Sequence, residues 1–165
     1  MTQPIHILYV DDYPLDRELV RDALEREHGG FAVVEAKSRK DFEENLLSGG
    51  FDVVLSDFNI LGFEGLQVLE EVKEKYPEIP VIIVTGTGSE EVAAEAIKRG
   101  AADYIIKTPK HIQRLPHIIH DALEKKQLEM KNRQMATAVP QTRALLTNLA
   151  QLVPGVIYQY RLYPD

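Results

Sequence analysis

Three aspartates, a threonine and a lysine stand where apolar segments of the chain end. Asp11 and Asp12 follow the run IHILYV, and Asp57 follows DVVLS with no basic residue nearby in sequence. Thr85 and Lys107 follow two later runs, PVIIV and ADYII. Carboxylates suit a hard divalent cation, while an ammonium group and a hydroxyl bind phosphate oxygens. This set of residues therefore predicts phosphoryl-transfer chemistry.

A metal ion would explain why so many acids are expected in one place. Three carboxylates within about 5 Å of one another repel by about 3 kcal/mol per pair at an effective dielectric near 20. A divalent cation removes that penalty, and Mg²⁺ (or Mn²⁺) suits one or two carboxylates, several waters and a substrate phosphate. We expect a carboxylate nucleophile beside such a cation, with catalysis arising mostly from positioning and charge neutralisation.

An α/β sheet is the fold expected to gather these residues. Five apolar runs typical of buried strands alternate with five amphipathic helical patterns. The expected strands are residues 5–10, 31–35, 52–56, 80–84 and 102–106. The expected buried helical faces are Leu15, Leu19, Ala23 and Leu24; Phe42, Leu46 and Leu47; Val68, Leu69, Val72 and Tyr76; Val92, Ala93, Ala96 and Ile97; and Ile112, Leu115, Ile119 and Ala122.

The order of these elements predicts where the site lies. Strict alternation of strands and helices indicates a doubly wound parallel sheet with helices on both faces. The functional crevice of such a sheet lies at the carboxyl ends of its strands. Every polar residue of the predicted site follows a strand at that edge, so we interpret these residues as one site.

Composition excludes several other classes of protein. The 165 residues suffice for one domain and an appendage, and they are 44% hydrophobic and 27% charged. The absence of Cys excludes a disulfide framework, a thiol nucleophile and Cys-ligated zinc. A net charge of −7 with scattered basic residues argues against direct nucleic-acid binding. We see no signal peptide and no apolar run of about 20 residues, and therefore expect a cytoplasmic protein without membrane contact.

Four motifs, in order along the chain, resemble those of a response-regulator receiver domain over about residues 4–123. They are the acidic pair in YVDD, the acceptor in LSD, the hydroxyl in VTG and the lysine in YIIK. The resemblance implies a flavodoxin-like sheet with strand order 2-1-3-4-5, followed by an extended C-terminal helix. It also implies a two-component function. Asp57 would take a phosphoryl group from the phosphohistidine of a histidine kinase or phosphotransfer protein.

The resemblance further implies a ligand set for Mg²⁺ (or Mn²⁺). Asp12, Asp57 and the backbone carbonyl of Asn59 would ligate the ion. Asp11 would act largely through a water molecule.

Roles in phosphate binding and switching are implied in the same way. Lys107 would hold the phosphoryl group, Thr85 would move towards it, and Tyr104 would rotate inward as the aromatic switch. The positions that tune phosphate access or lifetime in the family are Asn59, Gly86 and Thr87 here.

The sequence departs from the family at two positions. Leu61 stands four residues after the acceptor, where the family usually has proline, so the following turn loses a rigid element. Thr108 separates Lys107 from Pro109, whereas the family's lysine is usually followed directly by a cis proline. A cis Lys107–Thr108 bond would cost about 2.5–4 kcal/mol, which leaves the placement of the lysine open.

After about residue 123 the chain becomes polar but remains helix-prone, and we expect a helical linker over residues 124–140 that ends at Pro140. Leu128 and Met135, seven residues apart, fit either a short coiled-coil seam or a solvated helix. Residues 141–165 resemble the N-terminal part of a PAS domain, with a helix, the PGVIY turn and a first strand. Such an arrangement implies a longer signalling protein, whose output would be a histidine kinase or a cyclic-dinucleotide enzyme.

Phosphorylation is expected to remodel the surface formed by the fourth helical pattern, strand 102–106 and the fifth helical pattern. Together with the linker helix, this surface is expected to control a homodimer. We expect no enzymatic activity beyond the phosphorylation and dephosphorylation of the domain itself.

Three alternatives share part of the pattern. A receiver used only for docking would keep the fold without taking up phosphate. A haloacid-dehalogenase-like phosphatase also uses Mg²⁺ and an aspartate nucleophile, but its acids alternate as D-x-D, whereas Asp11 and Asp12 are adjacent. A flavodoxin-like cofactor module needs a phosphate-cradling loop after its first strand, and DDYPLDR is acidic and has no glycine.

Overall fold

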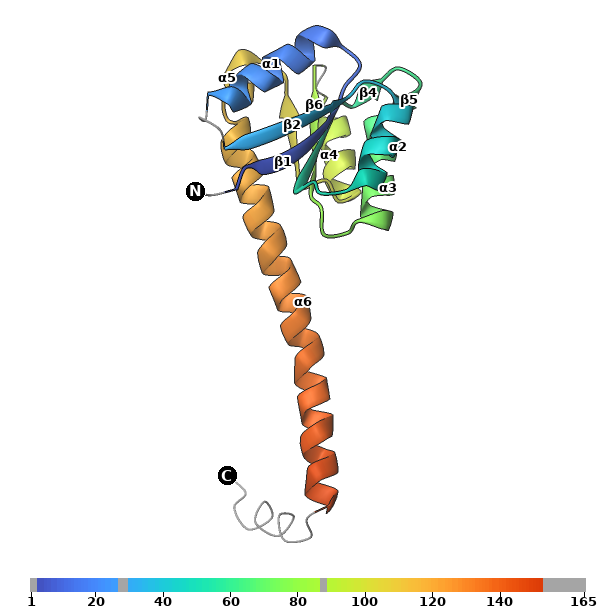
Figure 1. The fold of residues 1–165 in the computed structure, drawn as a ribbon, viewed down its shortest axis with the longest axis vertical. Helices are drawn as coiled ribbons and strands as arrows, with labels where there is room; N and C mark the ends of the chain where they lie inside the picture. The colour runs from blue at the N-terminus through green and yellow to red at the C-terminus, as the bar shows by residue number, and fades with distance from the viewer. Residues whose placement is uncertain (1–2, 27–29, 87–88, 153–165) are drawn as a thin grey trace. The chain divides into compact units, whose positions relative to one another are not determined.

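The computed structural model describes residues 3–26, 30–86 and 89–152, with side chains described up to residue 137 (Figure 1). The chain divides into two compact units, residues 1–126 and 127–165. The first unit contains the sheet and all predicted site residues. Of the second unit, the structure describes the helical residues that precede residue 153.

Five parallel strands form the central sheet in the order β2-β1-β3-β6-β7, which confirms the predicted order 2-1-3-4-5. Each strand begins or ends within one residue of its predicted boundary. The strands are β1 (Ile5–Val10), β2 (Phe31–Ala36), β3 (Val53–Ser56), β6 (Val81–Thr85) and β7 (Asp103–Ile106). The sequence did not predict a small antiparallel hairpin, β4 (Asn59–Ile60) and β5 (Phe63–Glu64), directly after β3.

Helices cover both faces of the sheet (Figure 1). They are α1 (Pro14–Glu25), α2 (Arg39–Ser48), α3 (Gly65–Lys75), α4 (Glu90–Lys98), α5 (Pro109–Ile112) and α6 (Leu115–Leu152). Side chains alternate across each strand, so Leu8 and Val10 join the core formed with α2, α3 and α4, whereas Ile7 and Tyr9 join the core formed with α1, α5 and α6. Two apolar layers therefore fix the sheet between them.

Local side chains set several helix boundaries. The Ser38 hydroxyl accepts a hydrogen bond from the Asp41 N–H at 3.1 Å and caps α2. The Ser89 hydroxyl accepts one from the Val92 N–H at 3.2 Å and caps α4. Gly49 follows the end of α2 with φ 69°, a left-handed conformation that glycine adopts without steric cost.

Some predicted helical faces are wrong by one residue or one turn. Leu15 is 62% exposed and Leu47 is 73% exposed, although both were expected in the core. Successive helical residues differ by about 100° in direction, so burial of Leu46 turns Leu47 towards solvent. On α4, Ala96 is buried and Ile97 is 48% exposed for the same reason.

The fifth helical pattern forms two helices rather than one. Helix α5 ends at Ile112 and α6 begins at Leu115. Pro116 has no backbone N–H to donate to the Ile112 carbonyl, so the first helix does not continue into the second. Side chains of both helices nevertheless enter the same apolar core.

The predicted helix end at Pro140 is also wrong, because α6 continues to Leu152. An internal proline removes one backbone hydrogen bond, but residues such as Ala, Leu and Gln on either side favour the helix. The domain boundaries proposed at residues 123 and 140 are a separate matter from the helix end, and they stay predictions. The strand expected after Val153 lies outside the described residues. Within the described part of the chain, no helix has the length and apolar character required to cross a bilayer.

Leu46 and Leu47 provide a matched test of this packing. We expect Leu46→Ala to lower the free energy of unfolding by about 2–4 kcal/mol, because it removes a buried side chain. Leu47→Ala should change it by less than about 0.5 kcal/mol. Urea unfolding followed by circular dichroism measures both, and equal losses would contradict the helix orientation described here.

Candidate functional site

The parallel register of β1 and β3 brings the predicted acids together. Val10 pairs with Ser56, so the residues that follow, Asp11 and Asp57, leave the sheet at the same level. The Asp57 N–H donates to the Val10 carbonyl at 2.8 Å. One carboxylate oxygen from each of Asp11, Asp12 and Asp57 lies within 4.8 Å of the others. This oxygen-rich cluster fits one hard divalent cation.

Burial makes the negative charges of this cluster costly, because water stabilises them less. Asp11 is fully buried and Asp57 is 8% exposed, whereas Asp12 is partly exposed. Burial raises the pKa of the Asp57 carboxyl and the Asp11 charge raises it further, while the Lys107 ammonium acts in the opposite direction. The Phe58 N–H donates to Asp57 Oδ1 at 2.8 Å and also favours the charged form. A bound cation would favour ionised Asp57 in the same sense as Lys107.

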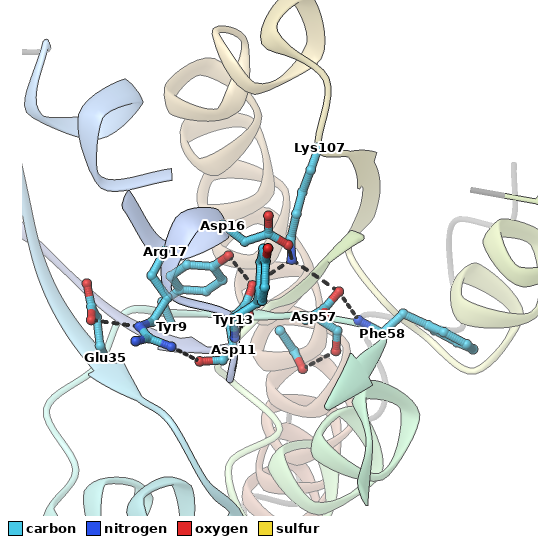
Figure 2. A network of polar contacts seen from close by, with 10 residues as sticks. Tyr9, Asp11, Tyr13, Asp16, Arg17, Glu35, Asp57, Phe58 and Lys107 are labelled. Atoms are coloured by element: carbon cyan, nitrogen blue, oxygen red, sulfur yellow. Dashed lines mark hydrogen bonds and ion pairs between the residues drawn. The ribbon is translucent and has the colours of Figure 1, made fainter. Parts of the chain in front are cut away.

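Lys107 lies among three carboxylates (Figure 2). Its Nζ is 2.5 Å from Asp11 Oδ2, 2.7 Å from Asp16 Oδ2 and 3.3 Å from Asp57 Oδ1, and the side chain is 1% exposed. Burial alone would lower the pKa of Lys107, but the hydrogen bonds to Asp11 and Asp16 and the charges of Asp11 and Asp57 together raise it. The lysine is therefore a charged donor in an otherwise acidic pocket.

The lysine reaches this position without the proline that usually follows it. Its backbone N–H donates to the Thr85 carbonyl at 2.7 Å, which extends the pairing of β6 and β7. Thr108 then caps α5, with Pro109 in the first turn of that helix. The sequence left open whether the Lys107–Thr108 bond is cis. No peptide bond among the described residues is cis, so this bond is trans.

Asp11 is held by residues that the sequence analysis did not assign to the site. Tyr9 donates its hydroxyl to Asp11 Oδ2 at 2.5 Å, and the Tyr13 N–H donates to Asp11 Oδ1 at 2.8 Å (Figure 2). Burial, followed by the Asp11 charge, raises the pKa of Tyr9, so Tyr9 remains a neutral donor. Arg17 donates to the Asp11 carbonyl at 2.9 Å and pairs with Glu35 at 3.0 Å.

Gly65 supports the acceptor from the opposite side. The Gly65 N–H donates to the Phe58 carbonyl at 2.8 Å. A Cβ at this glycine would come 3.0 Å from the Phe58 Cα and closer still to the Asp57 carbonyl oxygen. Only a residue without a side chain lets the start of α3 approach the acceptor this closely. A glycine just before a helical pattern was the sequence feature that could have indicated this contact.

The β4–β5 hairpin explains how the chain tolerates Leu61. Asn59 pairs with Glu64 and Ile60 with Phe63, so Leu61 and Gly62 form the turn. Gly62 has φ 89°, and Leu61 is 85% exposed. The turn is thus shaped by the glycine and needs no proline. Asn59 lies in β4 and is exposed. The role of its backbone carbonyl as a metal ligand stays a prediction.

The remaining predicted residues lie on β6 and β7 or next to them. Thr85 ends β6 and is 1% exposed, and Gly86 after it is exposed, with open space where a Cβ would be. Tyr104 on β7 is half-buried, and its buried hydroxyl has no hydrogen-bond partner among the described residues. Burial and then the Asp57 charge raise the pKa of Tyr104. Thr87 lies outside the described residues, and the switching and lifetime roles stay predictions.

Comparison with known proteins assigns the chain to a protein family. The model of the response regulator receiver domain matches residues 7–120. The chain therefore belongs to the response regulator receiver domain family of two-component signalling. This assignment separates it from the phosphatase and cofactor-module alternatives. The match does not extend to residues 141–165, and none of the comparisons supports the PAS resemblance of that segment.

Among curated relatives, the chain is similar to the transcriptional regulatory protein ZraR of Klebsiella oxytoca. The two are 32% identical over 161 residues, which are 93% of this chain and 36% of ZraR. The chain spans between 21% and 36% of the length of the curated relatives that it matches.

Two solved structures are also informative. The response regulator TrrA from Thermotoga maritima, in complex with Mg²⁺ and BeF, is 25% identical with a TM-score of 0.63, covering 72% of this chain and 98% of that one. The beryllofluoride-activated receiver domain dimer of NtrC4 is 30% identical with a TM-score of 0.64, covering 73% and 98%. A receiver similar to this one has thus been seen with magnesium, and another as a dimer.

Gly65 and Gly86 provide a matched pair for testing the site. We expect Gly65→Ala to lower the free energy of unfolding by about 1–3 kcal/mol, because the methyl group meets the Asp57 backbone. The same displacement should weaken Mg²⁺ binding, measured by calorimetric titration. Gly86→Ala adds its methyl group to open space and should retain stability within about 0.5 kcal/mol. Unchanged Mg²⁺ binding in Gly65→Ala would contradict the supporting role of this contact.

Proposed function

We propose that this chain is a phosphoacceptor module in which Asp57 takes a phosphoryl group from the phosphohistidine of a histidine kinase or phosphotransfer protein. The observation that carries the proposal is the Asp57 carboxylate, which lies 3.3 Å from Lys107 Nζ and within the cluster of three acids. A receiver domain implies a histidine kinase as partner.

The donor set of the acidic cluster fits Mg²⁺ or Mn²⁺. Carboxylates of Asp12 and Asp57 and the backbone carbonyl of Asn59 would hold the ion, with Asp11 acting through water. When bound, the ion would neutralise carboxylate charge and polarise the phosphoryl oxygens. The complex of TrrA with Mg²⁺ and BeF supports this choice of cation.

The residues of the chain would divide the chemistry among them. An Asp57 carboxylate oxygen forms the new bond to phosphorus while the phosphorus–nitrogen bond of the donor breaks, and the histidine leaves with the electron pair and takes up a proton. Lys107 neutralises charge on the transferred group, and the Phe58 N–H orients the carboxylate. Thr85 and Tyr104 would then move towards the phosphate.

Intact mass spectrometry tests the acceptor directly. After incubation with acetyl phosphate and Mg²⁺, the wild-type chain should gain about 80 Da, the mass of one phosphoryl group. Asp57→Asn lacks the nucleophile and should gain nothing, and chelation of the metal by EDTA should suppress the gain in the wild type. A wild-type chain that takes up no phosphate would instead favour a receiver that serves only for docking.

The surface formed by α4, β7 and α6 is the proposed output face. Between these elements lies a cavity of about 570 Å³, lined in part by Ala93, Tyr104, Ile106, Arg114 and Ile118. The switch residue Tyr104 thus lies on the wall of the cavity, so its movement would change this surface. The dimer of the NtrC4 receiver domain supports a homodimer as one consequence.

The linker helix offers a second contact for such a dimer. Leu128 is 54% exposed and Met135 is 65% exposed, and two helical turns separate them along one face of α6. We propose that this face pairs with its copy when the receiver is phosphorylated.

Sedimentation analysis with beryllofluoride tests this coupling. The wild-type chain should shift towards dimer when beryllofluoride and Mg²⁺ are added, whereas Asp57→Asn should not respond. Leu128→Gln with Met135→Gln should weaken the dimer about tenfold or more, because two apolar contacts are lost. Lys131→Gln, at an exposed position between them, is the control. Identical association in all samples would refute the coupling.

The wider role proposed for the chain rests on the sequence pattern that follows the receiver domain. It would act in the cytoplasm as part of a longer signalling protein, with no catalysis of its own beyond phosphorylation and dephosphorylation of Asp57. The output would be a histidine kinase or a cyclic-dinucleotide enzyme. The resemblance of residues 141–165 to the start of a PAS domain supports a sensory module after the helix, and it rests on the sequence pattern alone.

A further inference from the structure

Asp16 contacts the phosphate-binding lysine although it is outside the acidic metal cluster. It lies in the first turn of α1, and its Oδ2 is 2.7 Å from Lys107 Nζ. This distance is shorter than the 3.3 Å between the lysine and Asp57 Oδ1. The residues whose oxygens gather for a cation are Asp11, Asp12 and Asp57. Asp16 therefore acts on the site through the lysine.

Two of the three N–H donors of Lys107 are already used in hydrogen bonds to Asp11 and Asp16. An ammonium group carries three N–H donors, and three carboxylates, those of Asp11, Asp16 and Asp57, lie around it (Figure 2). A phosphoryl group on Asp57 would bring additional oxygens that compete for the same donors. To bind more than one of those oxygens, the lysine must give up a hydrogen bond that it makes now.

Asp16 is the carboxylate that can release the lysine at least cost. The Asp11 side chain is fully buried, so loss of the lysine would leave a buried carboxylate without a paired positive charge. The Asp16 side chain is 28% exposed, so water can replace the ammonium there. Asp11 also keeps the fixed hydrogen bonds from Tyr9 and Tyr13 that hold it in place.

We propose that Asp16 is a positioning residue that holds the Lys107 ammonium in the unphosphorylated state and competes for it with the phosphoryl group on Asp57. The inference rests on the proposed function of Asp57. Asp16 would thereby restrain both uptake and retention of phosphate, and its side chain would gain water as the lysine moves.

Asp16 takes no part in the bonds that form or break. With acetyl phosphate, an Asp57 oxygen bonds to phosphorus while the bond from phosphorus to the acetate oxygen breaks, and acetate leaves with the electron pair. In the reverse direction, a water oxygen bonds to phosphorus and the Asp57 carboxylate leaves. Inorganic phosphate and a proton are released. Asp16 affects only how much of the Lys107 charge is available during each step.

A double-mutant cycle with beryllofluoride, a phosphoryl mimic, tests the competition. The full chain is compared as wild type, Asp16→Asn, Lys107→Ala and the combination, in saturating Mg²⁺, with affinity measured by ¹⁹F NMR titration. We expect Asp16→Asn to raise affinity about three- to tenfold when Lys107 is present, since a charge-assisted contact to a partly exposed group no longer competes. The same change should have no effect in the Lys107→Ala background.

Two further variants separate this mechanism from simple changes of charge or folding. Asp22→Asn removes the same charge from an exposed position on α1 and should leave affinity unchanged. Asp16→Glu keeps a carboxylate at the position and should restore most of the wild-type affinity. Circular dichroism of each variant checks that it is folded. A gain equal to that of Asp16→Asn in Asp22→Asn, or a gain that persists without Lys107, would overturn the proposal.

The rate of phosphorylation distinguishes this inference from the function on which it rests. If wild-type chain gains no mass from acetyl phosphate, the proposed function of Asp57 fails. If it is phosphorylated but Asp16→Asn is phosphorylated no faster and binds beryllofluoride no more tightly, the function stands and the role of Asp16 is wrong. Faster phosphorylation together with tighter binding of the mimic supports both.

Discussion

Negative charge buried at one end of a parallel sheet is the constraint on which this site depends. Asp11 and Asp57 leave neighbouring strands at the same level and are shielded from water. Two carboxylates in such a place destabilise each other, and Lys107, which is also buried, supplies a cation within reach of both. The pocket is therefore a set of opposed charges held in place by the fold, and its three acids fit a divalent cation.

Hydrogen bonds from the surrounding chain keep the charges in fixed positions. The Tyr9 hydroxyl and the Tyr13 N–H fix the orientation of the Asp11 carboxylate, and Arg17 fixes its main chain. The Phe58 N–H orients the acceptor carboxylate. Donors that are already oriented need little rearrangement when charge develops nearby, which is how a protein site differs from the same groups in water.

The sequence predicted those features that follow from strand ends, and it missed those that depend on packing. Apolar runs that end in Asp11, Asp57 and Lys107 identify the edge of the sheet because strand order brings these ends together. The contact between Asp16 and Lys107 joins residues 91 positions apart and depends on where α1 packs. Tyr9 has the pattern of an ordinary core residue. The exposure of Leu47 depends on the rotation of α2, which a short apolar pattern leaves open.

The main chain of Asp57 is restrained on two sides, with a mechanical consequence. Its N–H is bonded to β1, its carbonyl accepts the Ser56 hydroxyl at 2.9 Å, and Gly65 packs directly against that carbonyl. These contacts leave the Asp57 main chain little room to move towards β1 or α3 when charge is added to its side chain. The proposed phosphoryl group would therefore have its freedom of movement on the side of β6 and β7, the strands that carry Thr85 and Tyr104.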